Sequence, residues 1–373
     1  MSNPFTPSFG VTPPLLVGRD NIIADFEEGL ADGVGSPSRA MLITGTRGSG
    51  KTVLLNALED VARHHGWLVI SLTARKGLLD ELTQDILPSA LARYRASAQR
   101  SIKQVSATVL GVGAGVTLND SPQAASGLRT SLFELTDIFT EQGAGVLITV
   151  DEAHRSAVDD LRPLTQEIQH AFRRGKNIGF CAAGLPEAVS DLLNDEVLTF
   201  LRRAERVELG TVSSEDIEQA LSIPASANGR DFAPDALATA VEGTRGYPFL
   251  IQSVGFECWR ASRGAESIGK QQAVDGVKAA TRRVGHLVHE PALATLSNVD
   301  KSFLAAMAVD SESSRVSDII ERLQISNQYA NTYRRRLMEF EIIYSPRHGY
   351  LDFTIPYLRE YLREHAASEH FLS

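Results

Sequence analysis

The stretch from Met41 to Thr52 constrains this 373-residue chain more than any other. It joins a short apolar run to the pattern Gly-x-x-x-x-Gly-Lys-Thr, whose glycines let the backbone turn its N–H groups toward an anion. Lys51 would reach the β- and γ-phosphates of a nucleotide, and the Thr52 hydroxyl would ligate Mg²⁺. The sequence therefore predicts a phosphate-binding loop. Its expected nucleotide contacts are Gly45, Thr46, Arg47, Gly48, Ser49, Gly50, Lys51, Thr52 and Val53.

The residues that follow this loop support the prediction. Residues 52–65 place their leucines on one helical stripe, and the stripe stops at Gly66. The loop would thus lie between a buried strand and a helix N-terminus, where the helix dipole favours phosphate. The alternative is a glycine-rich turn that matches by accident, and the strand and helix in the right places argue against it.

A pair of carboxylates follows a second apolar run. Residues 145–150 predict a buried strand that ends at Asp151 and Glu152. Asp151 would help to hold Mg²⁺, while Glu152 would orient and polarise the attacking water. We therefore expect ATP hydrolysis with Glu152 and Lys51 as catalytic residues and with ATP, ADP and Mg²⁺ as ligands. The guanine-specificity pattern Asn-Lys-x-Asp is not in the sequence.

Composition limits the partners and the compartment. The chain is 43% hydrophobic and 22% charged, as in ordinary globular proteins, and its net charge of −9 requires any DNA contact to be local. Cys181 and Cys258 lie far apart in apolar surroundings, which favours buried thiols in a reducing compartment. No run of 18 apolar residues and no signal-peptide pattern occurs. We expect a cytoplasmic protein that does not contact membranes.

Together these motifs resemble those of the AAA+ ATPases of the origin-recognition and archaeal type, in the ASCE class of P-loop proteins. The resemblance implies an α/β core with a parallel sheet, in which the strand ending at Asp151 is not adjacent to the P-loop strand. It also implies that Val17 and Gly18 contact the adenine base. Pro248, in a Gly-Tyr-Pro sequence, would pack on adenine, or would simply start a helix at its first turn.

Three features bear on the rate of hydrolysis. By resemblance, one of Arg202, Arg203 and Arg206 is the arginine finger of a neighbouring site, and Arg203 is favoured. Such a finger is worth on the order of 10³ in rate, although arginines also cap helices without that role. The polar sensor of the family would lie at residues 182–184, which are Ala-Ala-Gly, and the lid arginine would lie near Phe249 and is absent. These departures predict slow or partner-stimulated turnover.

The chain divides into four predicted parts. Residues 1–15 form an extended arm, and residues 16–210 form the P-loop core, with a β-hairpin insertion near 101–119. Residues 211–296 form a helical lid. Residues 297–373 form three short helices followed by a hairpin, which resembles a winged helix-turn-helix. The expected fold class is therefore α/β, with a helical lid and a C-terminal winged helix.

The third helix of the last part, residues 327–340, has one polar face. Its amide and guanidinium groups are of the kind that read base edges or bind phosphates in a major groove. Residues 298–373 carry nine basic and eleven acidic side chains, which opposes tight nonspecific DNA binding. Winged helices also bind proteins, so the expected partner is duplex DNA, another protein or a second copy of the chain. The expected DNA contacts are Gln328, Asn331, Arg335, Arg336 and Arg347.

Two functions remain open from the sequence alone. The first is an ATP-dependent switch or motor that couples nucleotide state to DNA or protein binding, which the intact Asp151-Glu152 pair favours. The second is a signal-transduction ATPase that holds nucleotide and hydrolyses it slowly or not at all, in regulation or defence. The missing polar sensor and lid arginine favour the second.

Overall fold

The computed structural model describes residues 2–7, 16–95, 127–153, 157–186, 189, 193 and 199–365, so the predicted hairpin near 101–119 lies outside the described residues. The chain forms two compact units. The sheet unit contains Asn21–Thr44 and Leu54–Glu208. The helical unit contains Met1–Asp20, the P-loop segment Gly45–Val53 and Leu209–Ser373.

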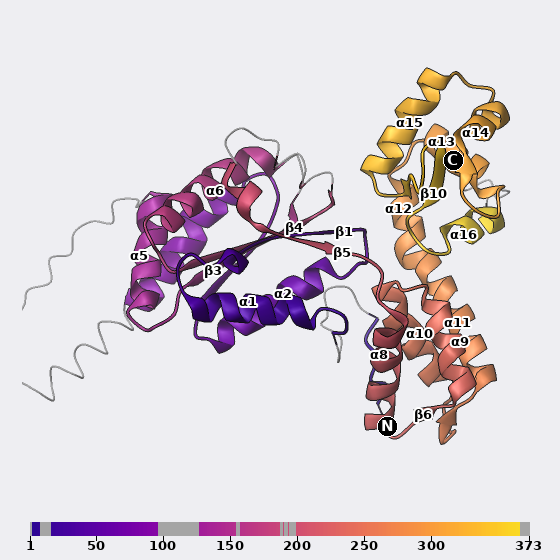
Figure 1. Cartoon of the computed structure of the whole chain (residues 1–373), viewed down its shortest axis with the longest axis horizontal. Coiled ribbons are helices and arrows are strands. Elements are labelled where there is room, and N and C mark those ends of the chain that lie inside the picture. The colour runs from indigo at the N-terminus through magenta and orange to yellow at the C-terminus, as the bar shows by residue number, and fades with distance from the viewer. Residues whose placement is uncertain are drawn as a thin grey trace, which may run out of the picture. The chain divides into compact units, whose positions relative to one another are not determined.

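The sheet unit is built on a five-stranded sheet in the order β2-β3-β4-β1-β5 (Figure 1). β4 separates β1 from β3, so the prediction that the strand ending at Asp151 is not adjacent to the P-loop strand is confirmed. The ladders β2–β3, β3–β4 and β4–β1 are all parallel. Largely continuous buried runs form the inner strands β1, β3 and β4, because helices cover both faces of the sheet. The strands are β1 (Ala40–Gly45), β2 (Leu68–Thr73), β3 (Val146–Ala153), β4 (Ile178–Gly184) and β5 (Glu205–Leu209).

Helices flank this sheet, with α1 and α2 on one face and α5 and α6 on the other (Figure 1). Each helix buries one apolar stripe, as Leu54 and Leu58 of α2 and Leu161 and Ile168 of α6 illustrate. The elements are α1 (Asp20–Asp32), η1 (Pro37–Arg39), α2 (Lys51–His64), α3 (Leu78–Glu81), η2 (Leu82–Ile86), α5 (Leu128–Thr140), α6 (Val158–Arg173) and η4 (Thr199–Arg203).

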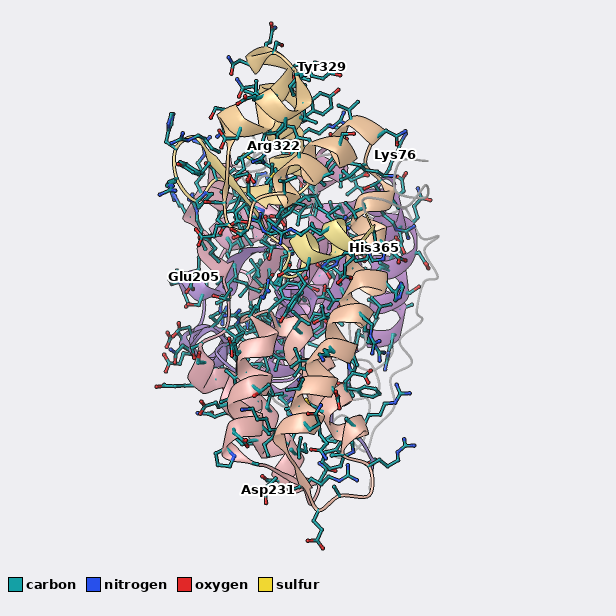
Figure 2. All side chains as sticks on the ribbon, turned by 90° about the vertical axis from the view of Figure 1, so that its right-hand side faces the viewer. Lys76, Glu205, Asp231, Arg322, Tyr329 and His365 are labelled. Carbon is teal, nitrogen blue, oxygen red and sulfur yellow. The ribbon has the colours of Figure 1, made fainter. Side chains whose placement is uncertain are left out.

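The helical unit begins with four main helices and short β6 (Asp231–Phe232) and β7 (Ser267–Ile268). Ser213 caps α8 by accepting a hydrogen bond from the Asp216 N–H, and Pro248 occupies the first turn of α10. In Figure 2, Asp231 lies at one end of this unit and Tyr329 at the other. The helices are α8 (Ser214–Ala227), α9 (Pro234–Thr244), α10 (Pro248–Ala261) and α11 (Lys270–Val284).

The C-terminal part of the helical unit combines short helices with a three-stranded sheet in the order β8-β10-β9. α16 was not predicted from the sequence, and it buries Leu358 and Leu362. The elements are η5 (Gly285–His289), α12 (Glu290–Ala294), α13 (Asn298–Ala308), β8 (Ser314–Arg315), α14 (Val316–Leu323), α15 (Asn327–Glu339), β9 (Ile343–Tyr344), β10 (Tyr350–Phe353) and α16 (Leu358–His365).

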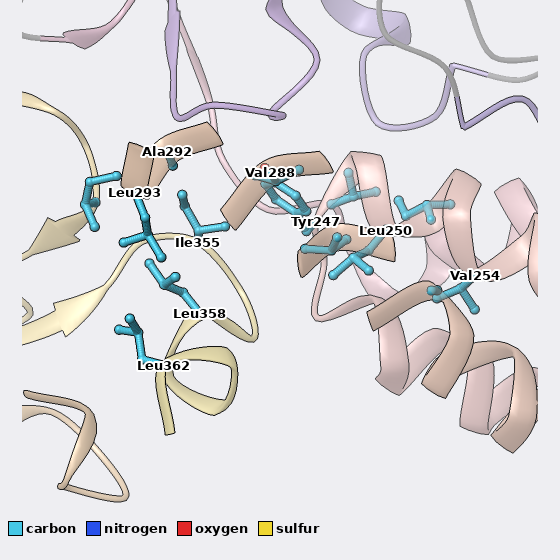
Figure 3. Close-up of a cluster of buried hydrophobic side chains, with 14 of the residues drawn as sticks. Tyr247, Leu250, Val254, Val288, Ala292, Leu293, Ile355, Leu358 and Leu362 are labelled. Carbon is cyan, nitrogen blue, oxygen red and sulfur yellow. The ribbon is translucent and has the colours of Figure 1, made fainter. Parts of the chain in front are cut away.

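One hydrophobic cluster runs through the whole helical unit. Leu250 and Val254 of α10 belong to the same cluster as Leu293 of α12 and Leu362 of α16 (Figure 3). The π-helical turn η5 and the short α12 connect the two ends of this cluster. Val288 of η5 lies between those two ends. Helices α8 to α11 and the C-terminal part therefore share a core, which couples their packing.

The N-terminal arm is packed onto this core. Phe5 is 1% exposed, and a Cβ at Gly255 of α10 would lie 2.5 Å from its ring. The Asn3 side-chain amide donates to the Phe256 carbonyl at 3.0 Å, and the Thr6 N–H donates to Gln252 at 3.2 Å. Gly255 is thus required for space, because any larger side chain would displace Phe5.

A buried arginine joins elements of the sheet unit. Arg39 is 1% exposed and donates from Nε to the Gly29 carbonyl at 2.7 Å and from the guanidinium to the Leu30 carbonyl at 2.6 Å. It also donates to Asn177 and lies 4.9 Å from the centre of the Trp67 ring. Burial lowers the pKa of Arg39, and the charge of Asp32 opposes that shift.

We predict that Arg39→Lys destabilises the sheet unit by about 2 kcal/mol, because lysine cannot reproduce the planar fork of donors. Urea unfolding followed by circular dichroism measures this change. The matched control is Arg129→Lys, which alters an exposed arginine paired with Glu167 and should leave the unfolding free energy unchanged. Equal effects of the two variants would contradict the structural role of Arg39.

A buried histidine makes the stability of the helical unit depend on pH. His289 is fully buried, and its Nε2 bonds to the Pro356 carbonyl at 2.9 Å. Burial lowers its pKa from 6.5 to about 4, despite the opposing effects of the Pro356 carbonyl and the Glu360 charge; nearby His365 lowers it further. The unfolded chain therefore takes up a proton near pH 6.5 that the folded unit accepts only near pH 4.

We predict that stability is full above pH 6.5 and falls by up to roughly 3 kcal/mol as the pH drops toward 4. Urea midpoints measured across this range should fall for the wild type. His289→Gln retains a side-chain donor but does not titrate, so its midpoint should change less over the same range. A parallel pH dependence in the variant would rule out His289 as the cause.

Candidate nucleotide-binding site

The predicted phosphate-binding loop joins β1 to α2. Gly48 and Gly50 have φ angles of 74° and 93°, in the left-handed region that side chains rarely adopt. A Cβ at Gly50 would meet no heavy atom within 4 Å, so this glycine is required for its backbone conformation rather than for space. α2 begins at Lys51, so the loop lies at a helix N-terminus, as the sequence predicted.

Side chains of the loop are held close to its backbone. Lys51 Nζ donates to the Gly45 carbonyl at 2.5 Å and to the Thr46 carbonyl at 2.9 Å. Ser49 is 3% exposed, and its Oγ has no hydrogen-bond partner in the described part of the chain. A buried hydroxyl without a partner costs free energy, so an oxyanion bound in the loop would satisfy it. Thr52 is exposed and Val53 is half-buried at the start of α2.

A tyrosine of the same unit contacts this loop. The Tyr247 hydroxyl donates to the Arg47 carbonyl at 2.6 Å, and a Cβ at Gly48 would overlap that hydroxyl. Tyr247 is 5% exposed, and burial raises its pKa, which keeps the hydroxyl protonated as a donor. This contact was not predicted from the sequence, although Tyr247 lies between Gly246 and Pro248 of the predicted adenine motif.

The predicted adenine contacts also lie in the helical unit. Val17 packs against the hydrophobic cluster of that unit, and Pro248 is half-buried at the start of α10. Gly18 has a φ of 68°, and a Cβ there would lie 2.9 Å from Asp216. Arg19 donates to the Gly210 carbonyl at 3.1 Å, and this contact holds the segment close to the residues that precede α8.

The predicted carboxylate pair lies at a bulge in β3. The ladder to β4 pairs Val150 with Ala182 but Ala153 with Gly184, so β3 carries one extra residue at Asp151 and Glu152. Glu152 is exposed and has a φ of 55°, which is unusual for a residue with a side chain. Asp151 Oδ1 accepts a hydrogen bond from the Glu152 N–H at 2.8 Å.

The parallel sheet places this bulge at a defined edge. β1 pairs with β4 up to the Thr44–Gly184 pair, and β4 meets β3 at the Gly184–Ala153 pair. The carboxyl ends of β1 and β3 therefore lie at the same edge of the sheet, where ligands of open α/β sheets bind.

The residues expected to carry a polar sensor are buried in β4. Ala182 and Ala183 are 3% and 0% exposed. A Cβ at Gly184 would clash with the Ala153 carbonyl oxygen, so no side chain fits there. The glycine at position 184 thus follows from the close approach of the bulged strand.

The candidate finger arginine ends a short 3₁₀ helix. Arg203 is exposed at the end of η4, and its neighbour Arg202 donates to the Leu193 carbonyl at 2.9 Å. An exposed guanidinium can reach a second molecule, whereas Arg202 is held by its own chain.

The predicted DNA-facing residues differ in their surroundings. Gln328, Asn331 and Arg335 are exposed on α15, and the Arg335 side chain is 3.8 Å from Glu339. Arg336 instead forms an ion pair with Asp300, which is 1% exposed, and donates to Ser297 Oγ at 2.7 Å. Projection of one helix placed Arg336 on the polar face and could not account for this pairing.

Aromatic side chains lie beside these predicted DNA contacts. The Arg347 guanidinium lies 3.8 Å from the centre of the Tyr350 ring. Tyr329 is 44% exposed at the end of the helical unit labelled in Figure 2, and it shares a hydrogen bond with Tyr333 on α15. No sequence signal pointed to Tyr329.

Within the described ranges, no group of three or more His, Cys, Asp and Glu side chains could hold a metal ion. None of the described helices combines the length and hydropathy required to span a membrane.

Comparisons with known proteins agree with this geometry. Residues 15–178 match the model of the AAA ATPase domain family, and residues 286–362 match a domain of unknown function. No curated protein matches the chain. The Walker-type ATPase of Pyrococcus abyssi is 18% identical with a TM-score of 0.64, over 93% of this chain and 96% of that chain.

The ORC2 protein of Aeropyrum pernix, solved as ADPNP–ADP complexes, is 16% identical with a TM-score of 0.62, over 96% of each chain. Its ADP form is 14% identical with a TM-score of 0.55, over 97% of this chain and 98% of that chain. These likenesses show a shared fold across both units. Residues 15–178 are therefore similar to an AAA ATPase domain, and the likenesses to solved structures show the fold of the chain.

Proposed function

We propose that this protein binds ATP and Mg²⁺ at its P-loop and hydrolyses ATP slowly, and that its nucleotide state controls binding of duplex DNA or a protein partner. The observation that carries this proposal is the conformation of the loop. Gly48 and Gly50 turn the backbone through left-handed angles, Lys51 is held at the loop, and the buried Ser49 hydroxyl has no partner among the described residues. This arrangement has the form of an anion-binding site.

The roles of the loop residues follow from their chemistry. Lys51 and the backbone N–H groups would neutralise the phosphates, and Thr52 with Asp151 would hold Mg²⁺. Val17, Gly18 and Pro248 would contact the adenine. The ADPNP–ADP complexes of the Aeropyrum pernix ORC2 protein, whose fold is similar, support adenine nucleotides as the ligands.

The conformation of Glu152 supports a catalytic role. A left-handed φ on a side-chain-bearing residue stores backbone strain of about 1 to 3 kcal/mol, and such strain concentrates at functional sites. Bulges are likewise frequent next to active sites, where they redirect a side chain. Glu152 is exposed and negatively charged, so it can accept a hydrogen bond from the attacking water and hold it in line.

Two features support slow turnover without a partner. Ala182, Ala183 and Gly184 offer no polar side chain to the γ-phosphate. Arg203 is exposed, so it would act on the site of a neighbouring molecule rather than on its own. A second candidate function, a signal-transduction switch that barely hydrolyses its nucleotide, is favoured by the same lack of a sensor.

The output surface that we propose is the exposed face of α15 and the turn before β10. Gln328, Asn331, Arg335 and Arg347 provide amide and guanidinium donors for bases and phosphates. Arg336 would act indirectly, because its ion pair with Asp300 holds α15 against the start of α13. A protein partner remains the alternative occupant, since this part of the chain is acidic overall.

We predict that Glu152→Gln lowers ATP turnover by about 10² to 10⁴ and leaves ATP affinity within about threefold of the wild type. Steady-state phosphate release is measured with and without duplex DNA, and binding is measured by calorimetry. The matched control is Glu215→Gln, which changes an exposed glutamate in the first turn of α8. DNA-stimulated turnover that Glu152→Gln abolishes supports the coupled ATPase. Tight nucleotide binding without turnover under any condition supports the signal-transduction switch instead.

We also predict that Tyr247→Phe weakens ADP binding about fivefold, because a lost hydrogen bond leaves the Arg47 carbonyl without its donor. The control is Tyr357→Phe, which removes a hydroxyl that donates to the Gly243 carbonyl of the same unit. Calorimetric titration with ADP separates the two variants. Equal ADP affinities in both would contradict a role for Tyr247 in preparing the loop.

A further inference from the structure

The helical unit contains a cavity that shares no residue with the proposed nucleotide site. Its volume is about 370 Å³, within the range of roughly 300 to 1,000 Å³ that is typical of small-molecule sites. It lies beside the turn before β6, at the end of the unit where Figure 2 labels Asp231. The lining residues are Asn3, Arg230, Phe256, Trp259, Arg260 and Arg263.

All charged residues that line this cavity are positively charged. Three of its six lining residues are arginines and none is acidic, although the whole chain has a net charge of −9. Concave sites lined by one sign of charge concentrate ions of the opposite sign. The cavity therefore favours an anion.

One arginine is fixed in place as part of the wall. Arg230 donates to the Trp259 carbonyl at 3.0 Å and to Ser262 Oγ at 3.2 Å, and its guanidinium lies 4.4 Å from the centre of the Trp259 ring. These contacts restrict its rotamers, so a ligand would meet a positive charge that is already positioned.

The other two arginines retain donors for a ligand. Arg260 is exposed and contacts Glu257 only loosely, at 3.6 Å. Arg263 is exposed in the turn after α10, and its side chain forms no hydrogen bond or ion pair with any described residue. Guanidinium groups bind phosphate oxygens with two parallel hydrogen bonds, which matches the donors that these two side chains offer.

The N-terminal arm closes one side of the cavity. Asn3 donates to the Phe256 carbonyl, and its side-chain oxygen accepts a hydrogen bond from the Phe5 N–H at 3.1 Å. Because Phe5 is buried against α10, this side is held in place before any ligand arrives. Phe256 is partly exposed and supplies an apolar surface beside the arginines.

We propose that this cavity binds the phosphate group of a small phosphorylated molecule. The three guanidinium groups take the phosphate oxygens, and Phe256 contacts the rest of the ligand. The limited volume of the cavity and its preformed walls favour a small molecule over an extended polymer.

The test uses the full-length protein carrying Lys51→Ala, which disables the P-loop and so removes its contribution to phosphate binding. Calorimetry at low salt measures the affinity for ribose 5-phosphate, inorganic phosphate and the dicarboxylate succinate. Arg260→Ala and Arg263→Ala should each weaken ribose 5-phosphate binding about tenfold. Arg282→Ala, at an exposed arginine of α11 outside the cavity, is the control and should change the affinity less than about twofold. Melting temperatures verify that each variant is folded.

Several results would overturn the proposal. These are no binding of either phosphate, affinities that neither cavity variant changes, or succinate bound as tightly as ribose 5-phosphate. Binding of a short DNA duplex that depends on Arg263, without binding of either small phosphate, would assign the cavity to nucleic acid instead. Preference for ribose 5-phosphate over inorganic phosphate would show that the Phe256 side of the cavity contributes.

Discussion

The hydrogen bond from Tyr247 to the Arg47 carbonyl is the interaction on which the nucleotide loop depends. A P-loop needs its N–H groups directed inward, and each carbonyl that faces away then requires another donor. The helical unit supplies that donor from a side chain that is 5% exposed. The conformation of the loop is therefore tied to the start of α10, so nucleotide binding and the placement of this helix are physically linked.

The bulge in β3 imposes a second constraint. One extra residue at Asp151 and Glu152 brings the Ala153 carbonyl so close to Gly184 that no side chain fits at the end of β4. The conformation of Glu152 and the glycine at position 184 thus have a common structural origin. The bulge that exposes Glu152 therefore also excludes a side chain at the end of the neighbouring strand.

Local sequence patterns predicted much of the fold but few of the long-range contacts. The P-loop, the separation of β1 from β3 and the C-terminal helices could be read from apolar periodicity, glycine spacing and family resemblance, since those depend on short stretches of sequence. The ion pair of Arg336 with Asp300 and the packing of Phe5 against Gly255 depend on residues far apart in the chain. The role of Tyr247 could not be predicted in the same way, because only its neighbours belong to a known motif.

In the proposed switch, the continuous hydrophobic core connects the P-loop to the output surface on α15. Tyr247 is buried in the same hydrophobic cluster as Val288, Leu293 and Leu358, so α10 and the C-terminal part share one core (Figure 3). Close-packed interiors transmit displacement because their side chains cannot yield independently. The ion pair of Arg336 then fixes α15 to α13 within the C-terminal part. In the proposed switch, a change in the P-loop that moves Tyr247 would therefore also move the exposed face of α15. If η5 were a flexible linker instead of a packed helical turn, it would not transmit this movement.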